Sequence, residues 1–283
     1  LTPPLAAQCP FNLALQEADE PEPEAKQFVR IALPGLSTDA ARRTFTLGVG
    51  AADVLDTYLS PLAYDGTTWT ADYRSEKQLS WWRGRISRIW QWHAAYGHVN
   101  NPQGNASMHD GELSLDWAAH YNRLVMRDEQ KSLRLAFGPQ IGARVGGTYH
   151  NRNGNNPAQG RVALELGLSA VADYRFRLFG TQWQWRTQGE MPLVGAMFTP
   201  HYGESYYQLF GLGHGTRNVR ATTPWSAPSF RLQTQLSLPF WHRRLSIGID
   251  ADIRQSHLNG LKRHRWNTAL TIGYTRTLQF SDR

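Results

Sequence analysis

One histidine in the sequence has neighbours that could support hydrolysis. If the chain is extended here, His120, Asp116 and Asn122 alternate with other residues and therefore share one side. A lipase-like or deacylase-like site also needs a serine beside the histidine and a third group that orients the ring. Ser114 is the nearest serine on that side, six residues or roughly 20 Å of strand away from His120. The segment therefore predicts no catalytic triad.

A pair of carboxylates is the second candidate. Asp250 and Asp252 lie on one side of an alternating segment, about 7 Å apart, with Arg254 next on that side. A protease that uses paired aspartates on a β-barrel also needs a histidine beside them, and the segment 245–255 contains no histidine. We expect the pair to bind arginines and the protein not to be an enzyme. A lipid hydrolase or protease is kept as an alternative.

Metal, cofactor and nucleic-acid sites are not expected. The ten histidines form no HxH or HxxxH pattern, and the single Cys9 permits neither an internal disulfide nor an all-cysteine metal site. The formal net charge of +7 would suit a nucleic-acid partner. However, no basic patch is interleaved with aromatic residues on one surface, so we predict no nucleic-acid partner.

A period of two dominates the chain from Arg43 onward. In 162–176, leucines and other apolar residues alternate with small, polar and charged ones, which is the pattern of a strand and not of a helix. Similar segments recur at 44–52, 68–77, 86–98, 111–124, 133–145, 182–191, 230–240, 245–255 and 266–274. Most run for about 10 to 15 residues, whereas strands of soluble proteins usually have about five or six.

These long strands predict an all-β protein, a transmembrane antiparallel β-barrel. No apolar run reaches the ~18 residues of a membrane helix, and aromatic residues gather near the margins of the apolar faces, as in a barrel that meets lipid headgroups. The expected aromatic girdle comprises Trp90, Trp117, Tyr121, Tyr174, Trp183, Trp266 and Tyr274.

The connections support ten strands. Long and short connections alternate, which predicts short periplasmic turns and long extracellular loops. Twelve strands is the alternative, because 192–229 is long and 205–210 is strand-like. We expect an acidic, proline-rich periplasmic arm at 1–42, followed by the barrel at 43–283.

The polar faces of the strands are expected to line a lumen that their side chains fill. A barrel of about eight strands has room only for side chains, and an open channel needs many more strands. The residues expected in this network of ion pairs are Arg134, Arg144, Arg175, Arg186, Arg231, Arg254, Glu112, Asp116, Glu165, Asp173, Glu190, Asp250 and Asp252.

Two extracellular connections are candidate contacts for partners. The segment 150–156 is rich in amides, and 192–229 is long, aromatic and glycine-rich; long loops of this kind are often functional. The candidate residues are Asn151, Arg152, Asn153, Asn155, Asn156, Tyr202, Tyr206 and Tyr207.

Four stretches resemble a group of Bacteroidota outer-membrane proteins of unknown function. They are VLDTYLSPL at 54–62, NRNGNNPA at 151–158, MFTPHYGESYY at 197–207, and RQS at 254–256 followed by Asn259, Leu261 and Lys262. The resemblance covers about 44–280 and brings no catalytic residues with it. It implies an integral member of a larger outer-membrane machine, such as a barrel-assembly or secretion complex.

We therefore expect a bacterial outer-membrane barrel that acts without enzymatic activity as a subunit or scaffold of a complex. Its expected partners are outer-membrane lipids and lipopolysaccharide, other barrel subunits and surface lipoproteins. A narrow channel or transporter for small solutes is the alternative, and the inward arginines would favour anions.

Overall fold

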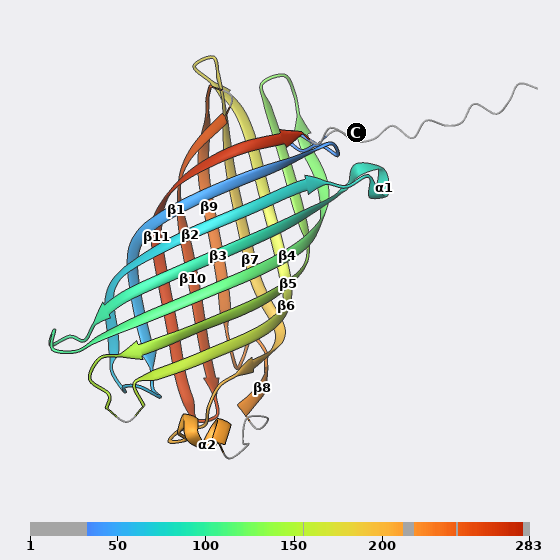
Figure 1. Ribbon diagram of the computed structural model, residues 1–283. Coiled ribbons are helices and arrows are strands. Elements are labelled where there is room, and N and C mark those ends of the chain that lie inside the picture. Colours follow the sequence, from blue (N-terminus) through green and yellow to red (C-terminus); the bar gives the residue numbers. More distant parts are fainter. Residues whose placement is uncertain (1–32, 155, 212–217, 242, 280–283) are drawn as a thin grey trace, which may run out of the picture.

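The computed structural model describes residues 33–154, 156–211, 218–241 and 243–279, and these form one closed antiparallel β-barrel (Figure 1). Ten long strands make the wall: β1 Ala40–Asp56, β2 Ala63–Gln78, β3 Ile86–Asn100, β4 Ser107–Arg127, β5 Lys131–His150, β6 Ala158–Leu178, β7 Thr181–Phe198, β9 Ser229–Phe240, β10 Arg243–Leu258 and β11 Leu261–Gln279. The short elements are α1 Trp81–Gly84, α2 Tyr206–Gly211 and β8 Val219–Thr222. The predicted ten-strand barrel is confirmed.

The strands are steeply tilted. β1 pairs with β11, and β6 pairs with β7, which closes the sheet. A path that starts at Val162 on β6 and steps from each residue to its partner on the next strand returns to β6 at Tyr174. The end of the path is therefore twelve residues along the strand from its start. Twelve residues of ~3.3 Å rise spread over ten strand spacings of ~4.8 Å correspond to a tilt of about 40°.

The two faces of the wall are inverted relative to a soluble protein. Apolar side chains such as Leu270 and Ile272 are exposed on the outside, whereas Thr44, Thr46 and most other inward residues are polar and buried. On β1 the outer apolar row lies between Arg43 and Asp53, ten residues apart. At a tilt of about 40° this row is roughly 25 Å tall, which matches the apolar band of an outer-membrane barrel.

The two ends of the barrel differ. The end that carries α1, the 128–130 turn, the 179–180 turn and the β9–β10 turn is named the short-turn end, and the chain enters and leaves the barrel there. The opposite end carries 57–62, 101–106, 151–157 and 199–228 and is named the long-loop end. β7 pairs with β9 only over 184–190; nearer the long-loop end it pairs with β8 instead.

The strands extend further than the sequence predicts, so several connections are shorter. The connection expected at 256–265 is a two-residue turn of Asn259 and Gly260, both with positive φ, as in the Asn-Gly turns that favour hairpins. The strand-like stretch 205–210 is mostly the short helix α2, so the twelve-strand alternative is wrong. Neither helix in the described part of the chain has the length and hydropathy to cross a membrane.

The predicted division at residue 43 falls just inside β1, which begins at Ala40. Most of the expected arm, including Cys9, lies outside the described residues, as does Asn155. Residues 33–39 are described and run to the start of β1.

The apolar band predicts a depth-dependent cost for charge. Leu270 is 67% exposed in the middle of the band, whereas Val125, 53% exposed, lies between Arg123 and Arg127 near the short-turn end. We expect Leu270→Arg to lower the free energy of unfolding by about 2–4 kcal/mol and Val125→Arg by at most about 1 kcal/mol. Urea unfolding in phospholipid bilayers, followed by heat-modifiable migration on gels, measures both. Equal losses would contradict the placement of the band.

Candidate functional site

The lumen holds the densest set of charged side chains in the protein. Among the described residues, twelve arginines and eleven carboxylates point inward from the strands, so the interior has a formal excess of one positive charge. All thirteen residues assigned to the lumen from the alternation lie there. The ten others are Arg42, Asp56, Asp72, Arg74, Glu76, Asp110, Arg161, Arg244, Arg263 and Arg265. Seven of these ten lie just beyond the predicted strand ends, where the alternation continues.

Two carboxylates organise the tier of the lumen nearest the short-turn end. Glu76 accepts hydrogen bonds from Arg42 at 2.5 Å and from Arg134 at 3.1 Å, and it forms an ion pair with Arg186 at 3.0 Å. Asp173 lies 3.3 Å from Arg42 and 3.2 Å from Arg134. Arg42 is on β1 and Asp173 on β6, five strands away in either direction, so this ion pair spans the barrel from wall to wall.

The middle tier is centred on the guanidinium of Arg231. Its Nη2 lies 2.6 Å from Asp72 Oδ1, 2.6 Å from Asp250 Oδ2 and 2.7 Å from His93 Nδ1. Asp72, His93 and Asp250 place one ligand atom each within 4.8 Å of one another, a spacing that would suit a metal ion. Arg231 occupies the position between them, so the arrangement fits a bound guanidinium. The alternating pattern of β10 alone could not predict a histidine beside Asp250, because His93 lies on β3, on the other side of the lumen.

Amides fill the remaining width of the middle tier. Gln91 donates to Gln233 at 3.0 Å, and Gln188 donates to Gln91 at 3.0 Å. Arg74 reaches Gln235 at 3.2 Å and Gln188 at 3.4 Å. These bonds join β2, β3, β7 and β9 with uncharged acceptors, so Arg74 is satisfied largely by amide oxygens.

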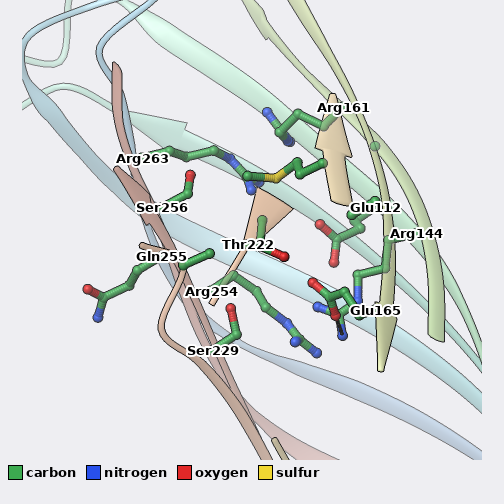
Figure 2. Close-up of a pocket in the computed structure, with 14 residues that line it drawn as sticks. Glu112, Arg144, Arg161, Glu165, Thr222, Ser229, Arg254, Gln255, Ser256 and Arg263 are labelled. Atoms are coloured by element: carbon green, nitrogen blue, oxygen red, sulfur yellow. Dashed lines mark ion pairs between the residues drawn. The ribbon is translucent and has the colours of Figure 1, made fainter. Parts of the chain in front are cut away.

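The third tier of the lumen, nearest the long-loop end, surrounds the small cavity shown in Figure 2. Arg161 lies 2.7 Å from Asp110 and 3.4 Å from Asp56, and Arg265 lies 2.8 Å from Glu112. Further ion pairs join Arg265 and Arg254 to Asp252 at 2.6 Å each and Arg144 to Glu165 at 2.7 Å. The cavity between these groups measures about 30 Å³, which is about the space of one water molecule.

An apolar cluster covers part of the long-loop mouth, beside β1 to β4. Ala52, Val54, Leu59, Tyr64, Val99, Ala106 and Met108 pack together and are buried. Leu59 comes from the 57–62 connection, and its carbonyl accepts from Asn153 Nδ2 at 3.3 Å. The Tyr64 hydroxyl lies 2.8 Å from His150 Nε2.

The long loop is tied to this cluster. Tyr206 packs edge-on against Tyr58, and its hydroxyl accepts from the backbone of Gly160. Burial raises the pKa of Tyr58 to about 12, so its hydroxyl stays protonated at neutral pH and donates to the Glu204 carbonyl at 2.8 Å. Asn259 anchors the start of the loop, because its Nδ2 donates to the Thr199 carbonyl at 2.7 Å.

The candidate partner residues divide into two groups. Asn151, Asn153 and Tyr206 make internal contacts, since Asn151 Oδ1 accepts from the Ser107 backbone at 3.0 Å, and the Asn153 side chain also accepts from the Asn156 backbone. Arg152, Tyr202 and Tyr207 are exposed at the long-loop end.

The short-turn mouth is covered by the segment before β1. Leu33 and Leu36 are buried, and the Leu36 N–H closes a turn on the Leu33 carbonyl at 3.1 Å. Gly35, with φ of +67°, lies against the guanidinium of Arg175, which projects from the opposite wall. A methyl group at Gly35 would displace that guanidinium, and the positive φ of this residue favours glycine.

The aromatic residues assigned to a girdle lie on the outer face at two levels. Six of them point outward from the half of the barrel nearer the short-turn end: Trp90, Trp117, Tyr121, Tyr174, Trp183 and Tyr274. Trp266 lies near the long-loop end, where its ring stacks on His264. Trp69 and Tyr96, whose ring centroids are 5.8 Å apart in a stacked pair, join Trp266 at that level.

The comparison with family models decides the family. The model described as "Protein of unknown function (DUF3316)" matches residues 36–282, almost the whole described part of the chain. The chain belongs to the DUF3316 family. No curated protein matches it.

This DUF3316 chain is also similar to several solved barrels. The outer membrane protease OmpT of Escherichia coli has a TM-score of 0.48 at 8% identity, over 89% of this chain and 100% of that one. The translocator domain of the autotransporter NalP from Neisseria meningitidis has 0.38 at 8%, over 86% and 90%. The COG4313 outer membrane channel of Pseudomonas putida F1 has 0.34 at 10%, over 91% and 100%.

The ion-pair tiers predict that one carboxylate near the short-turn end is indispensable. Glu76→Gln would leave three buried guanidiniums beside a neutral amide, so we expect the free energy of unfolding to fall by about 3–5 kcal/mol. Glu129→Gln makes the same chemical change at an exposed turn and should stay within about 0.5 kcal/mol of wild type. Unfolding in bilayers measures both. Equal stability of the two variants would show that the network does not hold the barrel.

Proposed function

We propose that the protein is an outer-membrane barrel that acts without enzymatic activity as a subunit or scaffold of a multi-protein complex. The closed lumen is the observation that carries this proposal. Ion pairs cross the lumen in three tiers, an apolar cluster covers part of the long-loop mouth, and residues 33–36 reach across the other mouth. With its interior filled, the protein offers other molecules its surfaces.

The long-loop end is the surface we assign to protein partners. Tyr202, Tyr207 and Trp225 are 72%, 74% and 90% exposed there, and exposed aromatic residues often dominate the energetics of interfaces. Arg152 is exposed at the same end. We propose that this end faces outward and binds a surface lipoprotein or another barrel subunit, and that the short-turn end and the 1–42 arm face the periplasm.

The motifs quoted above support a more specific setting. Their resemblance to Bacteroidota outer-membrane proteins suggests a barrel-assembly or secretion complex of such a bacterium, in contact with lipopolysaccharide and the lipids of the outer membrane.

Transport through the barrel is the less favoured function. A solute would have to displace ion pairs such as Arg231–Asp72 and Arg42–Asp173, and breaking a buried pair costs about 3–5 kcal/mol. An open aqueous channel usually needs more strands than ten.

Hydrolysis is less favoured for a similar reason. The acids and the histidine that come together, Asp72, Asp250 and His93, lie buried in the middle of the lumen. Arg231 already bonds to all three, so a substrate would have to displace the Arg231 guanidinium from between them.

Purification from native membranes tests the proposed role. In mild detergent, the wild type should retain a partner at fixed stoichiometry through affinity and size-exclusion steps, with mass spectrometry as the readout. The triple variant Tyr202→Ser, Tyr207→Ser, Trp225→Ser should remain folded and lose that partner. Trp241→Ser, at a residue 90% exposed at the other end, should keep it. Recovery of the wild type as a lone monomer would overturn the proposal.

A further inference from the structure

The excess positive charge of the described residues lies at one end of the barrel. The interior has an excess of one arginine, Arg244, which itself lies near the short-turn end. The long-loop end has three basic residues (Arg152, Arg220, Lys262) and three acidic ones (Asp53, Asp65, Glu204). At the short-turn end, six neighbouring strands place cations on the outer face, and we name one from each strand the basic belt: Arg43, Lys77, Arg88, Arg123, Arg243 and Arg276. Arg127 on β4 and Lys131 on β5 are also exposed, beside the 128–130 turn. The described acids at this end are Asp39, Asp128 and Glu129.

Two pairs within the basic belt are like charges placed directly opposite each other. Arg43 on β1 faces Arg276 on β11, and Lys77 on β2 faces Arg88 on β3. Such cross-strand pairs destabilise a sheet unless an anion lies between or beside them. Arg43 Nε is buried and lacks a hydrogen-bond partner within the described part of the chain. Asp128 does not neutralise these pairs, because its carboxylate accepts hydrogen bonds from the backbone of its own turn at 2.7 and 2.8 Å.

An apolar groove begins directly beside the Arg43–Arg276 pair. It measures about 490 Å³ and is lined by Phe45, Leu47 and Val49 of β1, by Leu270 and Ile272 of β11, and by Leu245 of β10. Arg243 lies 4.9 Å above the ring of Tyr274, at the edge of the same groove. The groove therefore runs from the basic belt into the apolar band.

We infer that this groove is a binding site for an anionic phospholipid. Its phosphate would lie between Arg43 and Arg276, where it offsets the like-charge pair, and an acyl chain would occupy the groove. The position of this phosphate along the barrel axis agrees with that of a lipid headgroup, because Arg43 lies at the edge of the roughly 25 Å apolar band. The inference requires only that the barrel spans a membrane, and it goes beyond the proposed role in a complex.

Native mass spectrometry of the detergent-solubilised full chain tests the site. The probes are phosphatidylglycerol and phosphatidylcholine with identical acyl chains; the choline cation of the second should be repelled by the two arginines. We expect the wild type to retain phosphatidylglycerol roughly tenfold better. The double variant Arg43→Gln, Arg276→Gln should lose this preference, whereas Arg152→Gln, Lys262→Gln at the long-loop end should keep it.

Two further measurements keep the inference falsifiable. In phosphatidylcholine bilayers the double variant should be at least as stable as wild type, because the like-charge repulsion is gone, so its loss of lipid preference would not reflect misfolding. Glycerophosphoglycerol, the headgroup without acyl chains, should fail to compete at the same concentration. Equal retention of both lipids by the wild type, an unchanged preference in the double variant, or full competition by the headgroup would overturn the site as described.

Discussion

Charge buried inside the barrel has to be neutralised across the lumen, and this constraint governs the rest of the structure. A guanidinium such as that of Arg134, 1% exposed, loses its hydration when the barrel closes, and only carboxylates and amides from other strands can replace the lost water. Glu76 and Asp173 do so for arginines on β1, β5 and β7. Because β1 and β6 lie on opposite walls, these pairs hold the barrel to a fixed diameter as well as neutralising charge.

The same constraint fixes the register of the strands. The outer face is apolar along the whole band, and lipid against such a face would give little preference for one apolar neighbour over another. A slip of one residue would turn Arg231 toward lipid and Leu232 into the lumen, so every such slip both unpairs charges and exposes them to hydrocarbon. The tiers of ion pairs therefore provide the specificity that a hydrophobic core gives a soluble protein.

The alternation of residues was enough to predict the ten strands and the inward side of each, because a period of two follows directly from strand geometry. It could not predict which charges meet. His93 and Arg231 belong to opposite walls, and their contact depends on tilt and stagger, which no single strand reveals. The sequence also predicts strands that are too short near Arg42, Arg161 and Arg265. There the outward residues are no longer apolar, while the inward residues are still polar. The two-residue turn at Asn259 and Gly260 follows from a local Asn-Gly signal, whereas the helix at 206–211 depends on the packing of Tyr206 against Tyr58.

A filled, cross-linked lumen is the central claim of this account, and the conductance of the purified protein tests it most directly. Planar-bilayer recording of the full chain should show no steady conductance across a range of voltages and salt concentrations, because ion pairs span the lumen at every tier and residues at both mouths narrow the entrances. A reproducible single-channel conductance from the folded wild type, lost when the barrel is unfolded by heat, would contradict it.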